Sequence, residues 1–180
     1  MPIGPGETYW FATNDAPPCG RDAPGRAREG LLGVFRGWHE PVERLIEATR
    51  EKHIVRTDIC DRPPSTKWGE GRVTLLGDAA HLMTPNLGQG ACQAIEDAVM
   101  LGECLARGGA GAVSLRAYEQ RGMGRANWFV ETSWRMGRIA QWQRPAAVWI
   151  RNTLVSLTPR SRAIAGMRQA VRFDPGSRGS

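Results

Sequence analysis

The sequence predicts an α/β fold, in which short strands dominate the first half and amphipathic helices the second. Two observations support this prediction. An apolar run near residue 75 leads into a loop rich in glycine and proline, and the hydrophobic period after residue 90 is helical. The length of 180 residues and the hydrophobic content of 41% suit one compact domain and are hardly enough for two.

Residues 1–70 predict part of a β-sheet with one helix. The aromatic run Tyr9–Thr13 is typical of a strand, and residues 14–30, rich in Pro, Gly and Asp, predict a loop. A helix is expected over residues 40–52, and residues 54–59 predict a second strand. The apolar face of the helix would consist of Val42, Leu45, Ile46 and Thr49.

Residues 71–110 predict a strand, a loop and a helix. The strand Arg72–Leu76 is nearly all apolar at its end, as in sheets that are buried on both faces. The helix would begin near Gly90 and end near Ala106, with a glycine pair as its stop signal. Its apolar face would consist of Ala91, Ile95, Ala98, Val99, Leu101 and Leu105.

Residues 111–180 predict C-terminal helices and a basic tail. Leu115–Gln143 fits one long helix or two, and after a proline break Ala146–Leu157 fits a further helix. From Arg160 onward we expect a basic, small-residue tail that frays after Phe173. Most of the tryptophans are expected to be buried anchors between helices. They are Trp68, Trp128, Trp134, Trp142 and Trp149.

The net charge of +6 is concentrated at the C-terminal end. From Arg116 onward there are 12 basic and 3 acidic residues. The arginines occur singly, without the basic cluster and aromatic platform of nucleic-acid readers, so we expect no nucleic-acid partner. A solvated helix face explains them, with dimer contact or membrane-surface contact as alternatives.

Several other classes are not indicated. The apolar stretches are too short for a transmembrane segment, and the first residues carry no secretory signal. The cysteines have neither CxxC pairing nor metal-ligand spacing to the histidines, so we expect free thiols, no metal site and a cytoplasmic protein. These cysteines are Cys19, Cys60, Cys92 and Cys104.

The loop between the predicted strand and helix carries the chemistry. An isolated Gly-Asp pair is usually a simple turn, but here the strand, Gly77, Asp78, a proline and paired glycines occur in order before a helix start. Asp78 is suited to accept a hydrogen bond from a sugar-like hydroxyl. The free amides of Gly90, Ala91 and Cys92, at the positive end of the helix dipole, would stabilise an anion or a polarised carbonyl such as the N1–C2=O edge of a flavin.

This segment resembles the second FAD-binding motif of class A flavoprotein monooxygenases, the family of aromatic hydroxylases and zeaxanthin-type epoxidases. The motif residues are Gly77–His81, Pro85, Gly88–Gly90 and Glu96–Ala98. The similarity also includes Trp10–Ala12, Asp61–Pro64, Trp68, Tyr118, Glu119 and Arg121, and so covers most of residues 3–125.

The resemblance implies a fold and a cofactor site. The chain would be the C-terminal part of an FAD/NAD(P)-binding Rossmann-like domain, with remnants of the substrate-binding β-sheet in residues 1–70, the FAD-binding strand, loop and helix in residues 71–110, and C-terminal helices after them. Asp78 would hold the ribityl or pyrophosphate part of FAD, and Pro85–Gly90 would border the isoalloxazine ring. The full set of cofactor-binding residues would be Gly77, Asp78, Ala79, Pro85, Gly88, Gln89, Gly90, Ala91 and Cys92. His81 is as well explained by a structural role as by a catalytic one, and no catalytic side chain is identified.

The resemblance also implies the reaction. FAD reduced by NAD(P)H would activate O₂ as a flavin C4a-hydroperoxide, which oxygenates an aromatic or polyene-like substrate. The sequence contains no GxGxxG and no second Asp-Gly motif, so we expect a C-terminal fragment that needs a missing N-terminal half or a homodimer partner. The alternatives are a non-catalytic remnant, a partner-completed module, or a flavin reductase or halogenase on the same scaffold.

Overall fold

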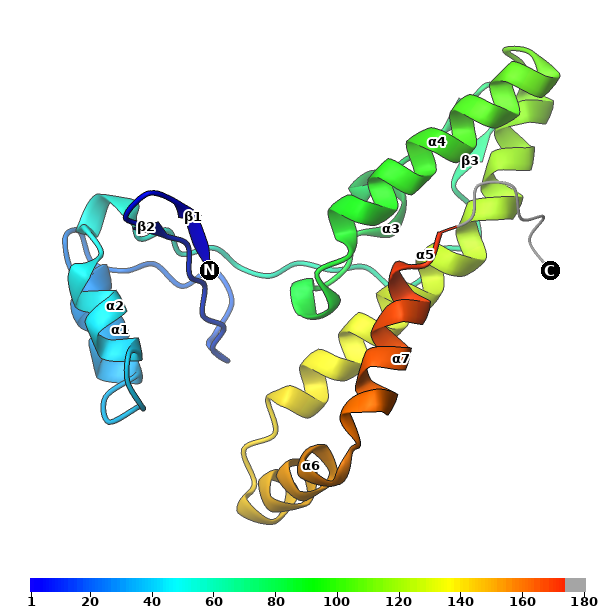
Figure 1. The fold of residues 1–180 in the computed structure, drawn as a ribbon. Helices are drawn as coiled ribbons and strands as arrows, with labels where there is room; N and C mark the ends of the chain where they lie inside the picture. The colour runs from blue at the N-terminus through cyan, green and yellow to red at the C-terminus, as the bar shows by residue number, and fades with distance from the viewer. Residues whose placement is uncertain (174–180) are drawn as a thin grey trace. The chain divides into compact units, whose positions relative to one another are not determined.

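The computed structural model describes residues 1–173, and the chain divides into two compact units, Met1–Asp58 and a second that begins at Ile59. Figure 1 shows the first unit as a small hairpin with short helices and the second as a group of longer helices.

The first unit contains an antiparallel hairpin and a helical pair. Strands β1 (Pro2–Gly4) and β2 (Glu7–Thr8) form the hairpin, and α1 (Ala27–Val34) packs against α2 (Val42–Ala48), which a 3-10 turn, η1 (Glu51–His53), follows. The predicted helix at residues 40–52 is thus confirmed in shortened form. Its predicted face is also confirmed, because Ile46 is buried while Val42, Leu45 and Thr49 are half-buried.

Three predictions for the first unit are wrong. Neither Tyr9–Thr13 nor residues 54–59 form a strand. Tyr9 exchanges two backbone hydrogen bonds with Met1, but within residues 1–173 no strand pairs with the residues that follow it or with residues 54–59. Asp58 accepts the N–H of Cys19 at 2.7 Å. The predicted loop over residues 14–30 ends early, since α1 begins inside it. The carboxylate of Glu51 accepts the N–H groups at the start of α1 and caps that helix from a distance in sequence.

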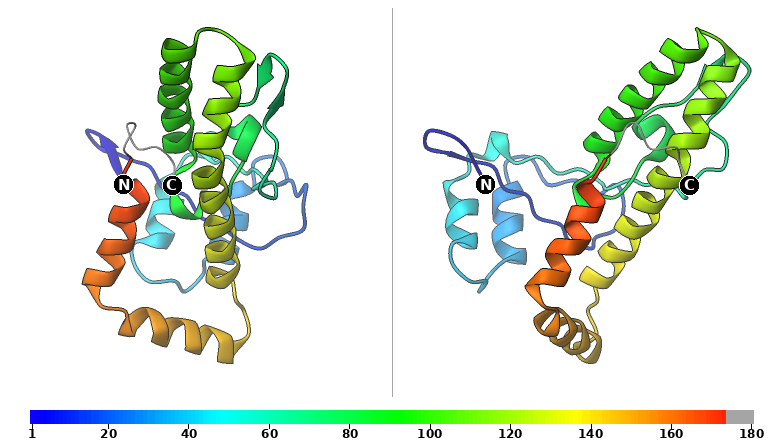
Figure 2. Two further views of the ribbon diagram at one scale, coloured as in Figure 1. Left: turned by 90° about the vertical axis from the view of Figure 1, so that its right-hand side faces the viewer. Right: turned by 45° about the vertical axis from the view of Figure 1, so that its right-hand side comes forward.

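The second unit is built around two long helices. After the hairpin of β3 (Gly69–Glu70) and β4 (Val73–Thr74) come the short helix α3 (Asp78–His81) and the 3-10 turn η2 (Pro85–Leu87). Helices α4 (Gly90–Gly108) and α5 (Ala112–Ala140) then lie side by side, as Figures 1 and 2 show. The core between them contains Trp68, Ala80, Met100, Cys104, Tyr118 and Ala126.

The predicted buried strand Arg72–Leu76 is largely wrong. Only Val73 and Thr74 are in strand conformation, and they pair antiparallel with β3 alone. The side chain of Val73 is 65% exposed, so the run does not have both faces buried. A strand needs partners on its edges and layers on its faces, and within the described residues β4 has only a two-residue partner.

Helix α4 starts at Gly90 as the sequence predicts and ends at Gly108, two residues beyond the predicted end near Ala106, with Gly109 in a positive-φ conformation just beyond its last residue. Its buried face, however, is not the predicted apolar one. Ile95 and Val99 are 66% and 42% exposed, and Ala91 and Ala98 are exposed as well, while only Leu101 and Leu105 are half-buried. The buried residues are Gln93, Glu96, Asp97, Met100 and Cys104. Glu96 turns inward toward the guanidinium of Arg125 on α5, and Asp97 turns inward toward the N–H of Gly77 and the ring of His81.

The C-terminal region is helical throughout the described part. The segment predicted as one or two helices is a single helix, α5, and α6 (Pro145–Leu157) follows at the proline break; Figure 2 shows α6 linking α5 to α7 (Arg160–Val171). The predicted tail is therefore a helix up to Val171, and the fraying predicted after Phe173 lies outside the described residues. Within residues 1–173 no helix is long and apolar enough to cross a membrane.

The prediction of buried tryptophan anchors holds only for Trp68, which is 1% exposed. The four others are 41% to 69% exposed. They lie on α5, on α6 and in the link between these helices, where few other elements pack against them. Arg138 is stacked over the ring of Trp134 at 4.9 Å, which is the packing of an arginine on an apolar neighbour that the sequence suggested.

Candidate functional site

Gly77 forms a tight turn between β4 and α3. Its φ of 59° and ψ of −139° are open essentially to glycine alone, and a Cβ there would lie 3.2 Å from the Cβ of Ala94. Gly77 is buried, whereas Asp78 and Ala79 directly after it are exposed at the start of α3. The close approach to Ala94 therefore brings the predicted Gly77–Ala79 segment beside the first turns of α4.

A buried carboxylate holds this turn in place. Oδ2 of Asp97 accepts the N–H of Gly77 at 3.0 Å and lies 2.6 Å from Nε2 of His81. Asp97 and His81 are 1% and 2% exposed, and Trp68 packs against the His81 ring with centroids 5.5 Å apart. His81 thus has the packed, hydrogen-bonded environment of a structural histidine. Charge-assisted bonds of this kind are stronger than neutral ones, and their loss leaves buried donors unpaired.

Tyr118 closes the same cluster from α5. Its ring lies 5.6 Å from that of Trp68, and its hydroxyl donates to the carbonyl of Leu75 at 3.3 Å. Burial raises the pKa of the Tyr118 hydroxyl above its ordinary range, and the negative charge of Asp97 adds to the shift. The hydroxyl therefore stays neutral and remains a hydrogen-bond donor.

Arg62 supports α3 from the other end. Its guanidinium donates to the carbonyls of Asp78 and Ala79 at 3.2 and 3.0 Å, and its backbone N–H donates to the carbonyl of Leu82. A helix as short as α3 leaves its carbonyls without intrahelical partners, so these bonds fix its orientation. Within the described residues no group binds the carboxylate of Asp78 itself, and this exposed acceptor is available to a ligand.

The second predicted segment, Pro85–Gly90, is a 3-10 turn followed by a helix start. The N–H of Gly88 donates to the carbonyl of Pro85 at 2.9 Å, and Gly88 has a φ of 63° with open space where a Cβ would lie. Pro85 and Gly88 are exposed, and Gln89 and Gly90 are half-buried. The turn thus presents its backbone at the surface, with no side chain on Gly88 to obstruct a flat ligand.

Helix α4 has unused amides at its start. Its first helical bond runs from the N–H of Gln93 to the carbonyl of Gln89 at 2.8 Å, so the amides of Gly90, Ala91 and Cys92 precede any intrahelical acceptor. No side chain caps them, and Ala91 and Cys92 are exposed. Together with the helix dipole, these amides favour a ligand atom that carries negative charge.

These groups suit the ring and the sugar-like chain of a flavin. The open space above Gly88 admits a planar ring, the amides of α4 suit its polarised N1–C2=O edge, and the carboxylate of Asp78 suits a hydroxyl. The structure brings the Gly77 turn against Ala94 and Asp97, in the second and third turns of α4. Asp97 appears in the sequence motif without a role, and only the structure shows it as the anchor of the turn.

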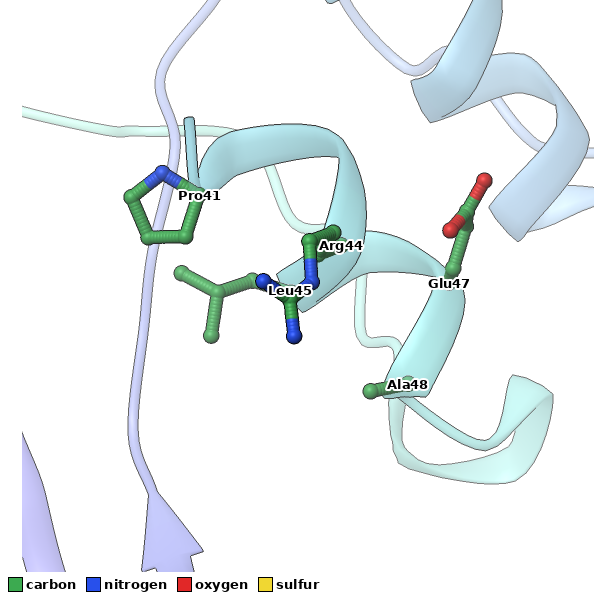
Figure 3. A pocket seen from close by; sticks show the side chains of 5 residues that line it. All are labelled: Pro41, Arg44, Leu45, Glu47 and Ala48. Atoms are coloured by element: carbon green, nitrogen blue, oxygen red, sulfur yellow. The ribbon is translucent and has the colours of Figure 1, made fainter. Parts of the chain in front are cut away.

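A pocket elsewhere does not include any of these residues. It lies along α2 in the first unit, and Figure 3 shows the side chains that line it. They are Pro41, Arg44, Leu45, Glu47 and Ala48. One short helix and the proline before it supply the whole lining, and its only charged side chains, Arg44 and Glu47, are exposed. The pocket therefore lacks the convergent polar groups that ligand sites need.

Comparisons with known proteins find similarity to FAD-binding proteins. Residues 59–133 match the FAD binding domain family. The chain is 49% identical over 175 residues to aurachin C monooxygenase/isomerase of Stigmatella aurantiaca, covering 97% of this chain and 45% of that protein. It is 52% identical over 99 residues to the chloroplastic zeaxanthin epoxidase of an Oncidium hybrid cultivar, covering 55% of this chain and 15% of that protein.

Two solved structures of an FAD-containing protein are also similar to this chain. The crystal structure of HpxO from Klebsiella pneumoniae complexed with FAD and uric acid superposes with a TM-score of 0.78 at 32% identity, over 85% of this chain and 40% of that one. A second HpxO structure, a variant complexed with FAD, has a TM-score of 0.80 at 32% identity, over 86% and 41% of the two chains.

Residues 59–133 thus resemble an FAD binding domain. Over most of its length the chain is similar to aurachin C monooxygenase/isomerase and to HpxO complexed with FAD. It spans less than half the length of the relatives it matches.

Proposed function

We propose that this chain forms the isoalloxazine and ribityl side of the FAD site in a monooxygenase that hydroxylates or epoxidises its substrate with NAD(P)H and O₂. The observation that carries the proposal is the Gly77–Asp78 turn, which Asp97 fixes against α4, the helix whose first amides are uncapped. In fold terms, the second unit would be the C-terminal part of a Rossmann-like FAD domain. The first unit would belong to the substrate-binding region.

Each predicted residue has a role in this proposal. The carboxylate of Asp78 would accept a hydrogen bond from the ribityl chain, with Gly77 and Ala79 giving close backbone approach. The turn from Pro85 through Gly88 and Gln89 would border the ring. The amides of Gly90, Ala91 and Cys92 would bind the N1–C2=O edge and stabilise the negative charge that gathers there on reduction.

Bound FAD would supply the redox chemistry, taking electrons from NAD(P)H for reaction with O₂. The contribution of this chain is to bind and orient the ring, to offset charge at its pyrimidine edge and to exclude water from one face. Backbone amides and small residues suffice for these tasks, which is why the site contains no nucleophile and base pair.

The substrate class is part of the proposal. An aromatic or polyene-like molecule is supported by relatives that are named for aurachin C and zeaxanthin, and by the uric acid in a solved neighbour. A cytoplasmic location is likewise proposed, in keeping with the four free cysteines. A second candidate is a module that binds flavin only together with further polypeptide, and it is favoured by the lack of a GxGxxG in these residues.

The direct test is an equilibrium titration of the 180-residue chain with FAD, followed by flavin fluorescence anisotropy. Equilibrium measurement is needed because low retention during dialysis is expected without a pyrophosphate loop. Asp78→Ala should weaken binding by roughly 10- to 100-fold, the value of one hydrogen bond to a charged group. Glu70→Ala, which removes only an exposed ion pair with Lys67, is the matched control and should leave binding unchanged. No detectable binding by the unmodified chain, or equal binding by Asp78→Ala, would contradict the proposal.

A further inference from the structure

The loop before α4 is tied to α5 by side chains that lie outside the predicted site. Oγ of Thr84 donates to Oγ of Ser133 at 3.0 Å, and the Ser133 hydroxyl donates back to the Thr84 carbonyl at 2.5 Å. The side-chain amide of Asn86 donates to Oγ1 of Thr84 at 2.9 Å and to the carbonyl of Ser133 at 3.1 Å. Three of these hydrogen bonds join segments that are 47 to 49 residues apart in sequence, and the bond from Asn86 to Thr84 lies within the loop.

The residues around these hydrogen bonds are closely packed against α5. Ser133 is 0% exposed, and a Cβ on Gly137, one turn further along α5, would collide with the side-chain amide of Asn86. Met83 and Leu87 on either side of the tied residues pack against the buried Phe129 and Val130 of α5. The loop therefore lies on α5 through both apolar and polar contacts.

The loop has little local structure that could fix it otherwise. Pro85 has no N–H to donate, Thr84 at the start of η2 makes no capping bond, and Gln89 at the start of α4 makes none either. Gly88 adopts the left-handed conformation with open space around it. Since the turn between residues 85 and 88 is closed by a single local backbone bond, its position depends on contacts with another element.

We propose that Thr84, Asn86 and Ser133 form a latch that positions the Pro85–Gly88 turn against the flavin ring. They are positioning residues, because they act through the backbone of the turn. This inference rests on the proposed function, which places that turn along the ring. The latch sets how far the turn stands from the first amides of α4, and hence whether both can contact one planar ligand.

The test compares Thr84→Val, which keeps the shape of the side chain but removes its hydroxyl, with Thr84→Ser, which keeps the hydroxyl. Thr84 has extended backbone angles, which valine also favours. Ser133→Ala removes the other half of the latch. Hydrogen exchange of the amides from Asn86 to Cys92 is measured by mass spectrometry on the full chain, and FAD binding is measured by titration together with the visible absorption spectrum of the bound flavin.

Thr84→Val and Ser133→Ala should speed exchange in this segment and weaken FAD binding, each by roughly 5- to 30-fold for one or two lost hydrogen bonds. The band shape of the bound flavin should change, and Thr84→Ser should behave like the unmodified chain. The thermal unfolding transition of each variant is measured as well. A changed flavin spectrum with an unchanged thermal transition would show that the turn has moved, because a general loss of stability would shift the transition.

Two negative results are distinguishable. If the unmodified chain binds no flavin, the proposed function fails. If it binds flavin, and Thr84→Val binds it equally well with the same spectrum, the latch inference alone is overturned, even where exchange has become faster. Equal behaviour of Thr84→Ser and Thr84→Val would also overturn it, since the hydroxyl would then have no role.

Discussion

Replacing Asp97 with asparagine should detach the Gly77 turn from α4. One oxygen of Asp97 accepts both the N–H of Gly77 at 3.0 Å and the N–H at Nε2 of His81 at 2.6 Å. Asp97 and His81 are only 1% and 2% exposed to water. Asparagine is nearly isosteric, but it is neutral, so hydrogen bonds to its oxygen are no longer charge-assisted. At least one charge-assisted bond is lost, so the free energy of unfolding should fall by about 1.5–3 kcal/mol.

Two measurements check this expectation. Urea unfolding followed by far-UV circular dichroism gives the change in free energy, and hydrogen exchange at the Gly77 amide reports the local bond. The matched control is Glu131→Gln, which removes an exposed pair with Arg135 on α5 and should cost less than about 0.5 kcal/mol. If Asp97→Asn also costs less than about 0.5 kcal/mol and the Gly77 amide exchanges at the same rate, Asp97 is not the anchor.

Four further outcomes follow from the same contacts. Because the site contains only ring-side and ribityl-side groups, riboflavin and FAD should bind within about tenfold of each other in parallel titrations; a much tighter FAD complex would require adenosine contacts. Gly77→Ala should lower the free energy of unfolding by about 1–2 kcal/mol, because a positive φ is combined with close contact to Ala94; an unchanged urea midpoint would show that the turn relaxes freely. Since the folded pKa of Tyr118 is raised, the folded state keeps a proton that the unfolded state releases, and stability should fall as pH rises above about 10; Tyr118→Phe should lessen this fall in alkaline urea titrations. Ile95→Lys, on the exposed face of α4, should change stability by less than about 0.5 kcal/mol, whereas Met100→Ala on the buried face should cost about 2–5 kcal/mol.

The sequence predicts those features that depend on neighbouring residues. The start of α4 at Gly90 and its end before Gly109 follow from glycine conformation and hydrophobic period, and the face of α2 around Ile46 follows from the same period. The Gly77–Asp78 turn is also local, since a strand, a glycine and a helix start occur within a few residues. For this reason the segment of the candidate site could be located from the sequence.

Features that depend on distant partners could not be predicted in this way. The β-prone run at residues 54–59 lacks a neighbouring strand within the described chain and stays irregular. The face of α4 was predicted from the spacing of its apolar residues, but Glu96 points inward, where the guanidinium of Arg125 binds it at 2.6 Å. One signal was available, because Gln93, Asp97, Met100 and Cys104 recur at helical spacing. Ser133 gave no signal at all, since its role consists of contacts with a loop 47 residues away.

The pairing of α4 with α5 connects these distant contacts. Asp97 on α4 holds the Gly77 turn, Ser133 on α5 holds the Pro85 turn, and the ion pair between Glu96 and Arg125 joins the two helices. The segments expected to border the flavin are thus positioned by one helical pair and not by the short strands beside them. It follows that a shift of α4 along α5 would move the two turns relative to each other, so the buried polar face of α4 fixes the geometry of the site as well as the packing of the unit.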